Sequence, residues 1–208
     1  MKTIIYFIII TAFLNIDATC SKRADCREMD LSFEGFYKAY PDRDSIRTAD
    51  TIWLESSIPV LQKNLATGEI VNFTGAVNLG FSISYIELKG GDLNSPGAIS
   101  SAAEFTNVLI KGIESVPVRP EQIRNFRFVE ENGFYHFKLA IIPKKRGLFA
   151  IAPGNSGSVY TNDNKCWEAG FSLTFKDTNQ RIFLYEQSRP GYAVSAYERS
   201  HMYVFRVY

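Results

Sequence analysis

The sequence predicts a mainly β protein, an antiparallel β-sandwich of immunoglobulin-like or related type with at most one or two short helices. Short runs alternate apolar with polar residues, as half-buried strands do. Turn signals rich in Gly, Asn and Pro separate these runs. The chain also contains sixteen Phe, eleven Tyr and two Trp, residue types that favour strands. These observations leave open one sandwich or two packed halves that meet near residues 116–121, where Pro117 and Pro120 would suit a linker.

Alternation and turn signals locate the expected strands. The strongest signal is Asn132-Gly133, a pair that favours a two-residue hairpin turn between 126–130 and 135–141. A second turn is expected at Thr67-Gly68, before a strand at 70–73. Further strands are expected at 51–55, 81–88, 171–175 and 203–207.

Two segments carry conflicting patterns. In 101–113, Ser101 and Glu104 fit a capping box at the start of a helix, but Glu104 to Lys111 also fits a strand, so both structures remain open. In 81–88, the apolar positions change phase after Tyr85, which predicts a β-bulge there.

Charge argues against a nucleic-acid partner. The chain has 23 Lys and Arg against 22 Asp and Glu, whereas nucleic-acid binding requires a basic face. The one tight basic cluster, Lys144-Lys145-Arg146, precedes Gly147 between two apolar runs. We expect it to form a solvated hairpin turn.

The first twenty residues have the pattern of a secretory signal peptide. Lys2 gives a basic start, Ile4 to Leu14 is apolar except for Thr11, and Cys20 closes the segment. The apolar run is shorter than the roughly 20 residues of a membrane span. We therefore expect a signal peptide at 1–19, a polar tether at 20–30 and the sandwich at 31–208.

The three cysteines are Cys20, Cys26 and Cys166, an odd number that calls for an explanation in an exported protein. Lipidation of Cys20, or cleavage before Ser21, would leave Cys26 and Cys166 as a pair. We expect a disulfide between these two, because oxidising compartments disfavour the alternative of two free thiols. The expected location is the cell envelope, as a lipoprotein anchored in a membrane through Cys20, with a soluble periplasmic or secreted protein as the alternative.

Three stretches resemble a group of exported, lipoprotein-like proteins of Bacteroidota for which no activity is known. They are the sequences DTIWLESS at 50–57, TGEIVNF at 67–73 and FKLAIIPKKRG at 137–147. The resemblance covers roughly residues 20–185, and members of the group also carry a second Cys soon after the first. It implies an exported location and no particular activity.

One motif is similar to the nucleophile loop of serine proteases. Gly154-Asn155-Ser156-Gly157 would need a histidine base held by a third group. The histidines are His136 and His201, and His136 lies on an expected strand twenty residues upstream. We therefore expect a glycine-rich turn and no catalytic residues.

The sequence shows no clear pattern for a metal site or for the paired carboxylates of a glycosidase. Asn162 to Asn164 with Asp177 could supply oxygen ligands to calcium, but the segment lacks the glycine and distal Glu of an EF-hand loop. We expect no metal and no cofactor. Glycoside hydrolysis needs two close carboxylates, and the sequence alone pairs none of the candidates: Glu104, Glu114, Glu130, Glu131, Glu168 and Glu186.

Binding is the remaining class. Exposed aromatic side chains could stack on sugar rings or contact a protein, and the residues favoured for this are Tyr192, Tyr197 and Trp167. Trp53 and Tyr185 are further candidates. The sequence therefore predicts a non-catalytic protein of the cell envelope or surface that binds or scaffolds an unidentified protein or glycan. A secreted hydrolase acting on glycans or peptides is the alternative, and a subunit of a larger envelope assembly also remains open.

Overall fold

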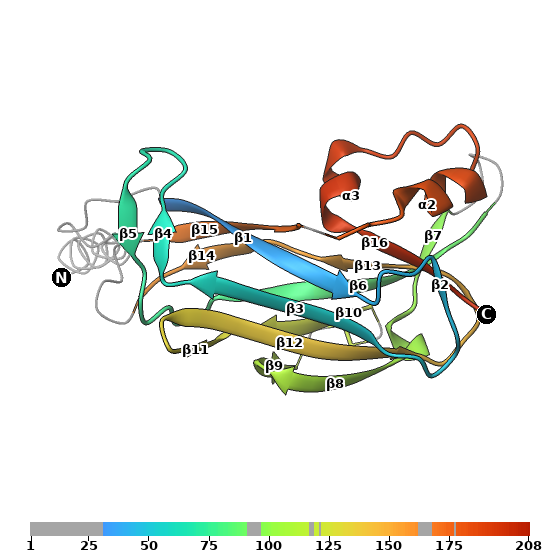
Figure 1. Cartoon of the computed structure of the whole chain (residues 1–208), viewed down its shortest axis with the longest axis horizontal. Coiled ribbons are helices and arrows are strands. Elements are labelled where there is room, and N and C mark those ends of the chain that lie inside the picture. Colours follow the sequence, from blue (N-terminus) through green and yellow to red (C-terminus); the bar gives the residue numbers. More distant parts are fainter. Residues whose placement is uncertain (1–30, 91–96, 117–118, 121, 162–167, 177) are drawn as a thin grey trace, which may run out of the picture.

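The computed structural model describes residues 31–90, 97–116, 119–120, 122–161, 168–176 and 178–208. These residues form two β-sheets packed face to face, with short helices at one end (Figure 1). The predicted mainly β sandwich is therefore confirmed. Cys20, Cys26, Cys166, Trp167 and the calcium candidates at 162–164 and 177 lie outside the described residues.

The first sheet, called sheet A, has seven strands in the described part of the chain. Its order is β11-β12-β3-β1-β15-β14, and β8 also pairs with β12. Its strands are β1 (Leu31–Tyr40), β3 (Ile52–Pro59), β8 (Phe105–Lys111), β11 (Val129–Glu131), β12 (Phe134–Pro143), β14 (Ser156–Val159) and β15 (Ala169–Phe175).

Sheet B also has seven described strands, in the order β2-β16-β13-β6-β10-β9, with β7 paired to β6. They are β2 (Ser45–Ile46), β6 (Gly80–Leu88), β7 (Ala98–Ser100), β9 (Ile113–Ser115), β10 (Ile123–Arg127), β13 (Gly147–Pro153) and β16 (Tyr203–Val207). A separate two-stranded hairpin consists of β4 (Leu61–Lys63) and β5 (Ile70–Asn72).

Each sheet combines strands from both sides of residues 116–121, so the two layers are not consecutive halves of the chain. Most neighbours are antiparallel, as expected. Two pairs are parallel, β1 with β15 and β2 with β16, and both join an early strand to a late one.

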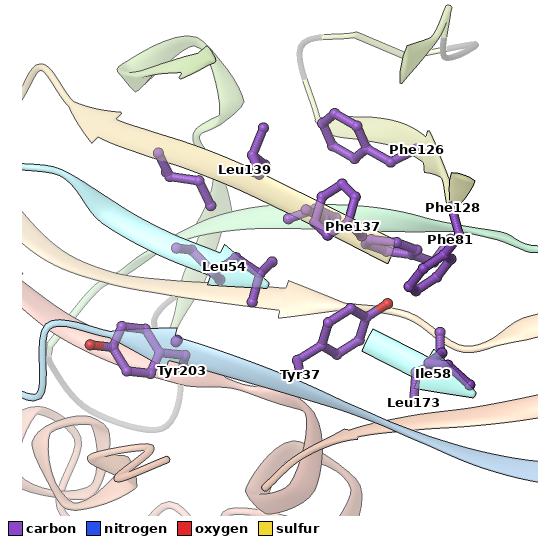
Figure 2. Close-up of a cluster of buried hydrophobic side chains, with 14 of the residues drawn as sticks. Tyr37, Leu54, Ile58, Phe81, Phe126, Phe128, Phe137, Leu139, Leu173 and Tyr203 are labelled. Atoms are coloured by element: carbon purple, nitrogen blue, oxygen red, sulfur yellow. The ribbon is translucent and has the colours of Figure 1, made fainter. Parts of the chain in front are cut away.

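The core lies between the two sheets and is rich in aromatic rings. Phe137 of sheet A contacts three rings of sheet B and its border, Phe81, Phe126 and Phe128, at centroid distances of 4.8, 5.4 and 6.0 Å (Figure 2). Phe81 and Phe137 meet edge to face, a favoured geometry for aromatic pairs.

Strand β1 lies at the centre of sheet A, yet sequence analysis missed it. Leu31, Phe33, Tyr37 and Ala39 alternate inward, and Gly35 interrupts the apolar pattern. A Cβ at Gly35 would lie 2.6 Å from Leu173 Cδ2 and 2.7 Å from Ile58 Cδ1. Close packing from the neighbouring strands therefore requires glycine at the position where the pattern breaks.

Two of the turns expected from sequence, at Asn132-Gly133 and Thr67-Gly68, are present. Asn132 and Gly133 have positive φ angles of 51° and 79° and join β11 to β12 in a two-residue hairpin. Gly68, with φ of 79°, lies in the turn between β4 and β5.

The segment 101–113 is mainly strand. A single 3-10 turn, η1 (Ala102–Glu104), leads into β8, which pairs with β12. The Ser101 side chain makes no capping hydrogen bond, so the capping box suggested by the sequence does not form. Burial of Phe105 against the core and pairing with β12 outweigh the local helical signal.

The expected bulge near Tyr85 is wrong. The register of β6 with β13 is continuous from Ile83 to Glu87. Glu87 occupies the inward position that an apolar residue would normally take, while Ile86 and Leu88 face outward. The phase change reflects a second apolar face and not an inserted residue.

That second face is covered by α2 (Ile182–Ser188) and α3 (Ala196–His201), which lie beside β16 at one end of the molecule (Figure 1). Leu184 and Tyr185 pack with Leu88, Ala150 and Val204 in a second buried cluster. We call this pair of helices the helical cover. Sequence analysis placed no helix here.

The Lys144 to Arg146 segment is exposed, as expected, but it does not form a hairpin. It connects β12 of sheet A to β13 of sheet B. The turn therefore carries the chain from one layer of the sandwich to the other.

Candidate binding groove on the outer face of sheet A

The outer face of sheet A, unlike the covered part of sheet B, is open and carries a groove of about 630 Å³. Strands β1, β3, β8 and β12 form its floor, and Lys176 follows β15 at its border. Six charged side chains line it: Lys38, Glu55, Lys111, Glu131, Lys138 and Lys176. We refer to this cavity as the groove.

The register of sheet A aligns four of these charged residues in one row across four strands. Lys38 on β1 is paired with Glu55 on β3, Glu55 with Lys138 on β12, and Lys138 with Lys111 on β8. Because strand order in the sheet differs from chain order, residues far apart in sequence become neighbours here.

A β-bulge in β8 brings Lys111 into this row. Leu109 is paired with Leu139, and Lys111 with Lys138, so Ile110 is the extra residue between them. Strict alternation from Leu109, which packs on the core, would turn Lys111 inward. With the bulge, both Ile110 and Lys111 line the groove. Bulges often serve to redirect a side chain near a functional site.

Ion pairs in the groove occupy both carboxylates. Lys138 Nζ lies 3.2 Å from Glu55 Oε2, which also accepts a hydrogen bond of 2.9 Å from the Tyr40 hydroxyl. Glu131 pairs with Lys111. Hydrogen bonding to Tyr40 and Glu55 raises the pKa of Lys138, and Lys111 lowers the pKa of Glu131. Lys138 and Glu131 are therefore charged at neutral pH.

Aromatic rings accompany the cations on this face. Lys176 Nζ lies 4.6 Å from the centroid of the Phe36 ring, and Lys138 Nζ lies 5.3 Å from the Trp53 ring. The Trp53 ring stacks on Tyr40 at 6.4 Å, with 23° between the planes. The cation–π contacts hold the lysines close to the sheet surface.

A second, smaller groove of about 290 Å³ adjoins the first. Phe36 and Ser57 line both, and the hairpin of β4 and β5 forms the far wall with Leu61 and Leu65. These two leucines are 59% and 51% exposed and lie beside the charged side chains of Glu34 and Lys63, so the smaller groove is mixed in character.

Two of the predicted binding residues lie in the helical region and do not line the groove. Tyr192 packs on Tyr185 and donates a 2.9 Å hydrogen bond to Glu198, which raises the pKa of Tyr192 to about 12. Tyr197 lies in α3, is 57% exposed and stacks on His201 at 3.9 Å. Trp53, the further candidate, lies beside the groove.

The serine-protease constellation does not assemble. His136 is on β12 and Ser156 on β14, with three strands of sheet A between them, or about 19 Å at ordinary strand spacing. His201 is the histidine near this loop, and its Nε2 lies 3.1 Å from Asn155 Oδ1. Ser156 is buried, and its hydroxyl accepts a hydrogen bond from the Gly80 amide. The loop serves to pack strands together.

The candidate carboxylates are dispersed. Glu114, Glu131 and Glu186 form ion pairs with Arg124, Lys111 and Arg199, respectively. The described residues contain no group of three or more His, Cys, Asp or Glu side chains placed to hold a metal ion. Neither α-helix in the described part of the chain has the length and apolar character of a membrane span.

Sequence analysis missed the four groove lysines. One signal was present: between Phe134 and Ile141 the positions opposite the apolar face hold Phe134, His136 and Lys138, a mixture of rings and cations. The same mixture appears in β1 as Phe36, Lys38 and Tyr40. Predicting that these two strands contribute to one surface required the order of strands in the sheet, which cannot be read from the sequence.

The comparisons with known proteins supply no family for this chain. A scan against protein-family models found no match to this chain, and a search of curated proteins found none either.

Proposed function

We propose that this chain is a non-catalytic binding protein of the cell envelope that holds its ligand in the groove on the outer face of sheet A. The observation that carries the proposal is the bulge at Ile110, which aligns Lys111 with Lys138, Glu55 and Lys38 on an open sheet face. Packing of the core does not require this bulge, because Leu109, the residue before it, already contacts the core.

The chemistry of the groove supports binding over catalysis. Its carboxylates, Glu55 and Glu131, are each held by a lysine, and the lysine lowers the pKa of Glu131. A general acid at neutral pH requires the opposite shift, a raised pKa. Cations and rings on a concave surface suit recognition of a ligand with charged groups and flat faces.

A variant that fills the groove tests the site. Ser57 is exposed on β3 and lines both grooves, so Ser57→Trp would occupy them without changing the core. Thr106→Trp is the matched control, because Thr106 is exposed on β8, on the same face of the sheet, and does not line either groove. We expect Ser57→Trp to lose binding to an array of soluble polysaccharides and peptides, and Thr106→Trp to retain it.

Two other results would contradict the proposal. If a folded Ser57→Trp protein, checked by circular dichroism, bound as the wild type does, the ligand site would lie elsewhere. If the wild type released products from the array, and Glu131→Gln abolished that turnover, the hydrolase alternative would replace binding.

The envelope location rests on the signal-peptide pattern of the first twenty residues and on Cys20. We expect the intact mass of the protein from its native membranes to correspond to a chain that begins at Cys20 with added acyl groups. Reduction is expected to add the mass of two hydrogen atoms as the Cys26–Cys166 bridge opens into two thiols. A lipid-free chain beginning at Ser21 would make the protein soluble, and an unchanged mass on reduction would rule out the bridge.

A further inference from the structure

We infer that the ligand of the groove is an anionic polysaccharide, one that carries carboxylate or sulfate groups on its sugar rings. The inference rests on the proposed function, since it identifies the ligand class of the same site. Three features of the groove support it: its unbalanced charge, the position of its floor in the sheet, and the rings beside its cations.

The charge of the groove is positive. Four lysines line it against two glutamates, and each glutamate already has a lysine partner. Lys38 and Lys176 have no carboxylate partner among the described residues. Two cations therefore remain available to a ligand, and an anionic group is the complement they lack.

The two available lysines lie on the same side of the groove. Lys38 is on β1, and Lys176 follows β15, the parallel neighbour of β1. The Lys176 amide donates a 3.1 Å hydrogen bond to the Tyr37 carbonyl, which fixes the backbone of Lys176 next to Lys38. Lys138 lies two strands from Lys38, about 10 Å at ordinary spacing. Positive charges thus recur across the groove at intervals on the scale of one or two sugar rings.

The floor of the groove argues against a peptide strand. Peptides that bind to sheets commonly pair with the free N–H and C=O groups of an edge strand. Here β1 and β3 each have strands on both sides, and their backbone groups are engaged in the ladder. Over β1 and β3, recognition must therefore come from side chains, which suits a polymer whose charged groups repeat and project outward.

Rings and apolar atoms supply the remaining contacts. Phe36 and His136 line the groove together with Ile110, which lies beside Lys111 on β8. Sugar rings have apolar C–H faces that pack on such side chains, while their charged substituents reach the lysines. The adjoining smaller groove, bordered by Phe36 and Ser57, lengthens the surface for further sugar units.

The experiment measures binding of the purified protein by isothermal titration calorimetry to three polymers: polygalacturonate, dextran sulfate and uncharged dextran. We expect binding to one or both charged polymers, weakened by added salt because the contacts are largely exposed. We expect Lys38→Glu combined with Lys176→Glu to weaken this binding at least tenfold. Lys144→Glu is the control, since Lys144 is exposed in the turn between β12 and β13 and does not line the groove.

The remaining outcomes separate this inference from the proposed function. Binding of uncharged dextran that Ser57→Trp abolishes, and the double charge reversal does not, would overturn the anionic class and keep the groove. Polyglutamate binding as tightly as the polysaccharides would overturn it in favour of an acidic protein. If the charged polymers bind but Lys144→Glu weakens binding as much as the double variant does, the groove does not select the ligand, and both proposals fail.

Discussion

The outer faces of the two sheets differ in what covers them. On sheet B, Ile86, Leu88 and Ala150 face outward, and in the cluster under the helical cover Leu88 and Ala150 are buried while Ile86 is partly buried. On sheet A, Lys38, Trp53 and Lys138 occupy the equivalent outward positions, and no helix lies over the groove they border among the described residues. Both faces follow the same two-residue alternation, so the residue types at the outward positions decide which face is closed and which stays open.

The outward residues of sheet B stabilise the fold, whereas those of sheet A contribute little to its stability. Burying the outward apolar side chains of sheet B contributes to stability, because it removes them from water. The lysines and rings around the groove are partly exposed and contribute little of this kind. Their arrangement therefore calls for another explanation, and ligand binding supplies one.

The largest effect is expected where the closed face is opened. Leu184 of α2 is 6% exposed and belongs to the second buried cluster. We expect Leu184→Ala to lower the free energy of unfolding by about 2–4 kcal/mol, because it removes buried methyl groups and leaves a cavity. Urea denaturation followed by tryptophan fluorescence would measure this. A loss below about 1 kcal/mol would mean that the helices only rest on sheet B.

The carboxylates that pair with lysines differ in burial between the two sheets. The Glu87 side chain is 8% exposed and interacts with Lys89 and Lys145, whereas Glu55 and Glu131 in the groove are 37% and 51% exposed. Burial disfavours the charge of Glu87, but hydrogen bonds from the two lysines outweigh it and lower the pKa of Glu87. A lowered pKa in the folded state means that the charged form stabilises the protein.

This stabilisation has a definite pH dependence. It is fully present above the unfolded pKa of about 4.3 and is lost as the pH falls through the folded value. We expect Glu87→Gln to reduce stability at pH 7 by about 1–2 kcal/mol and to flatten the loss of stability below about pH 5. Denaturation curves between pH 3 and 7 would show it, and parallel profiles for the two proteins would rule out the role of Glu87.

The smallest effect is expected on the open face. Ile110 is 53% exposed, and its replacement by Ala should change stability by less than about 0.5 kcal/mol. The same change removes an apolar contact from the groove and should weaken ligand binding. A stability loss as large as that of Leu184→Ala would show that the bulge is needed for folding, and the contrast between the two faces would disappear.

Local turn chemistry was predictable, because it depends on neighbouring residues. Asn132-Gly133 forms the expected hairpin since both residues adopt the positive φ angles that this turn requires. Capping boxes were less reliable. The pattern at Ser101 and Glu104 fails, because β8 pairs with β12 immediately afterwards. The same pattern at Ser195 and Glu198 forms fully and starts α3, a helix that was not predicted.

The groove was harder to predict from the sequence than the fold was. Its charged row needs β1 beside β3 and β3 beside β12, an order set by packing across the whole sheet. It also needs one extra residue in β8, and nothing in the local pattern marks Ile110 as that residue. Glu87 misled the prediction for a related reason, since a buried carboxylate with two lysine partners occupies a position where alternation predicts an apolar side chain.

The two parallel strand pairs have a consequence for the newly made chain. Leu31 is paired with Ala169, and Ser45 with Arg206, so each sheet is completed by a segment synthesised much later than its partner. During translation, β1 is made long before β15, and β2 long before β16, so each at first lacks its parallel partner. Contacts between segments this distant in sequence form slowly. An incomplete chain therefore exposes strands that lack a partner, and a premature stop before β16 would leave Phe149 and its neighbours on β13 paired with β6 on one side only.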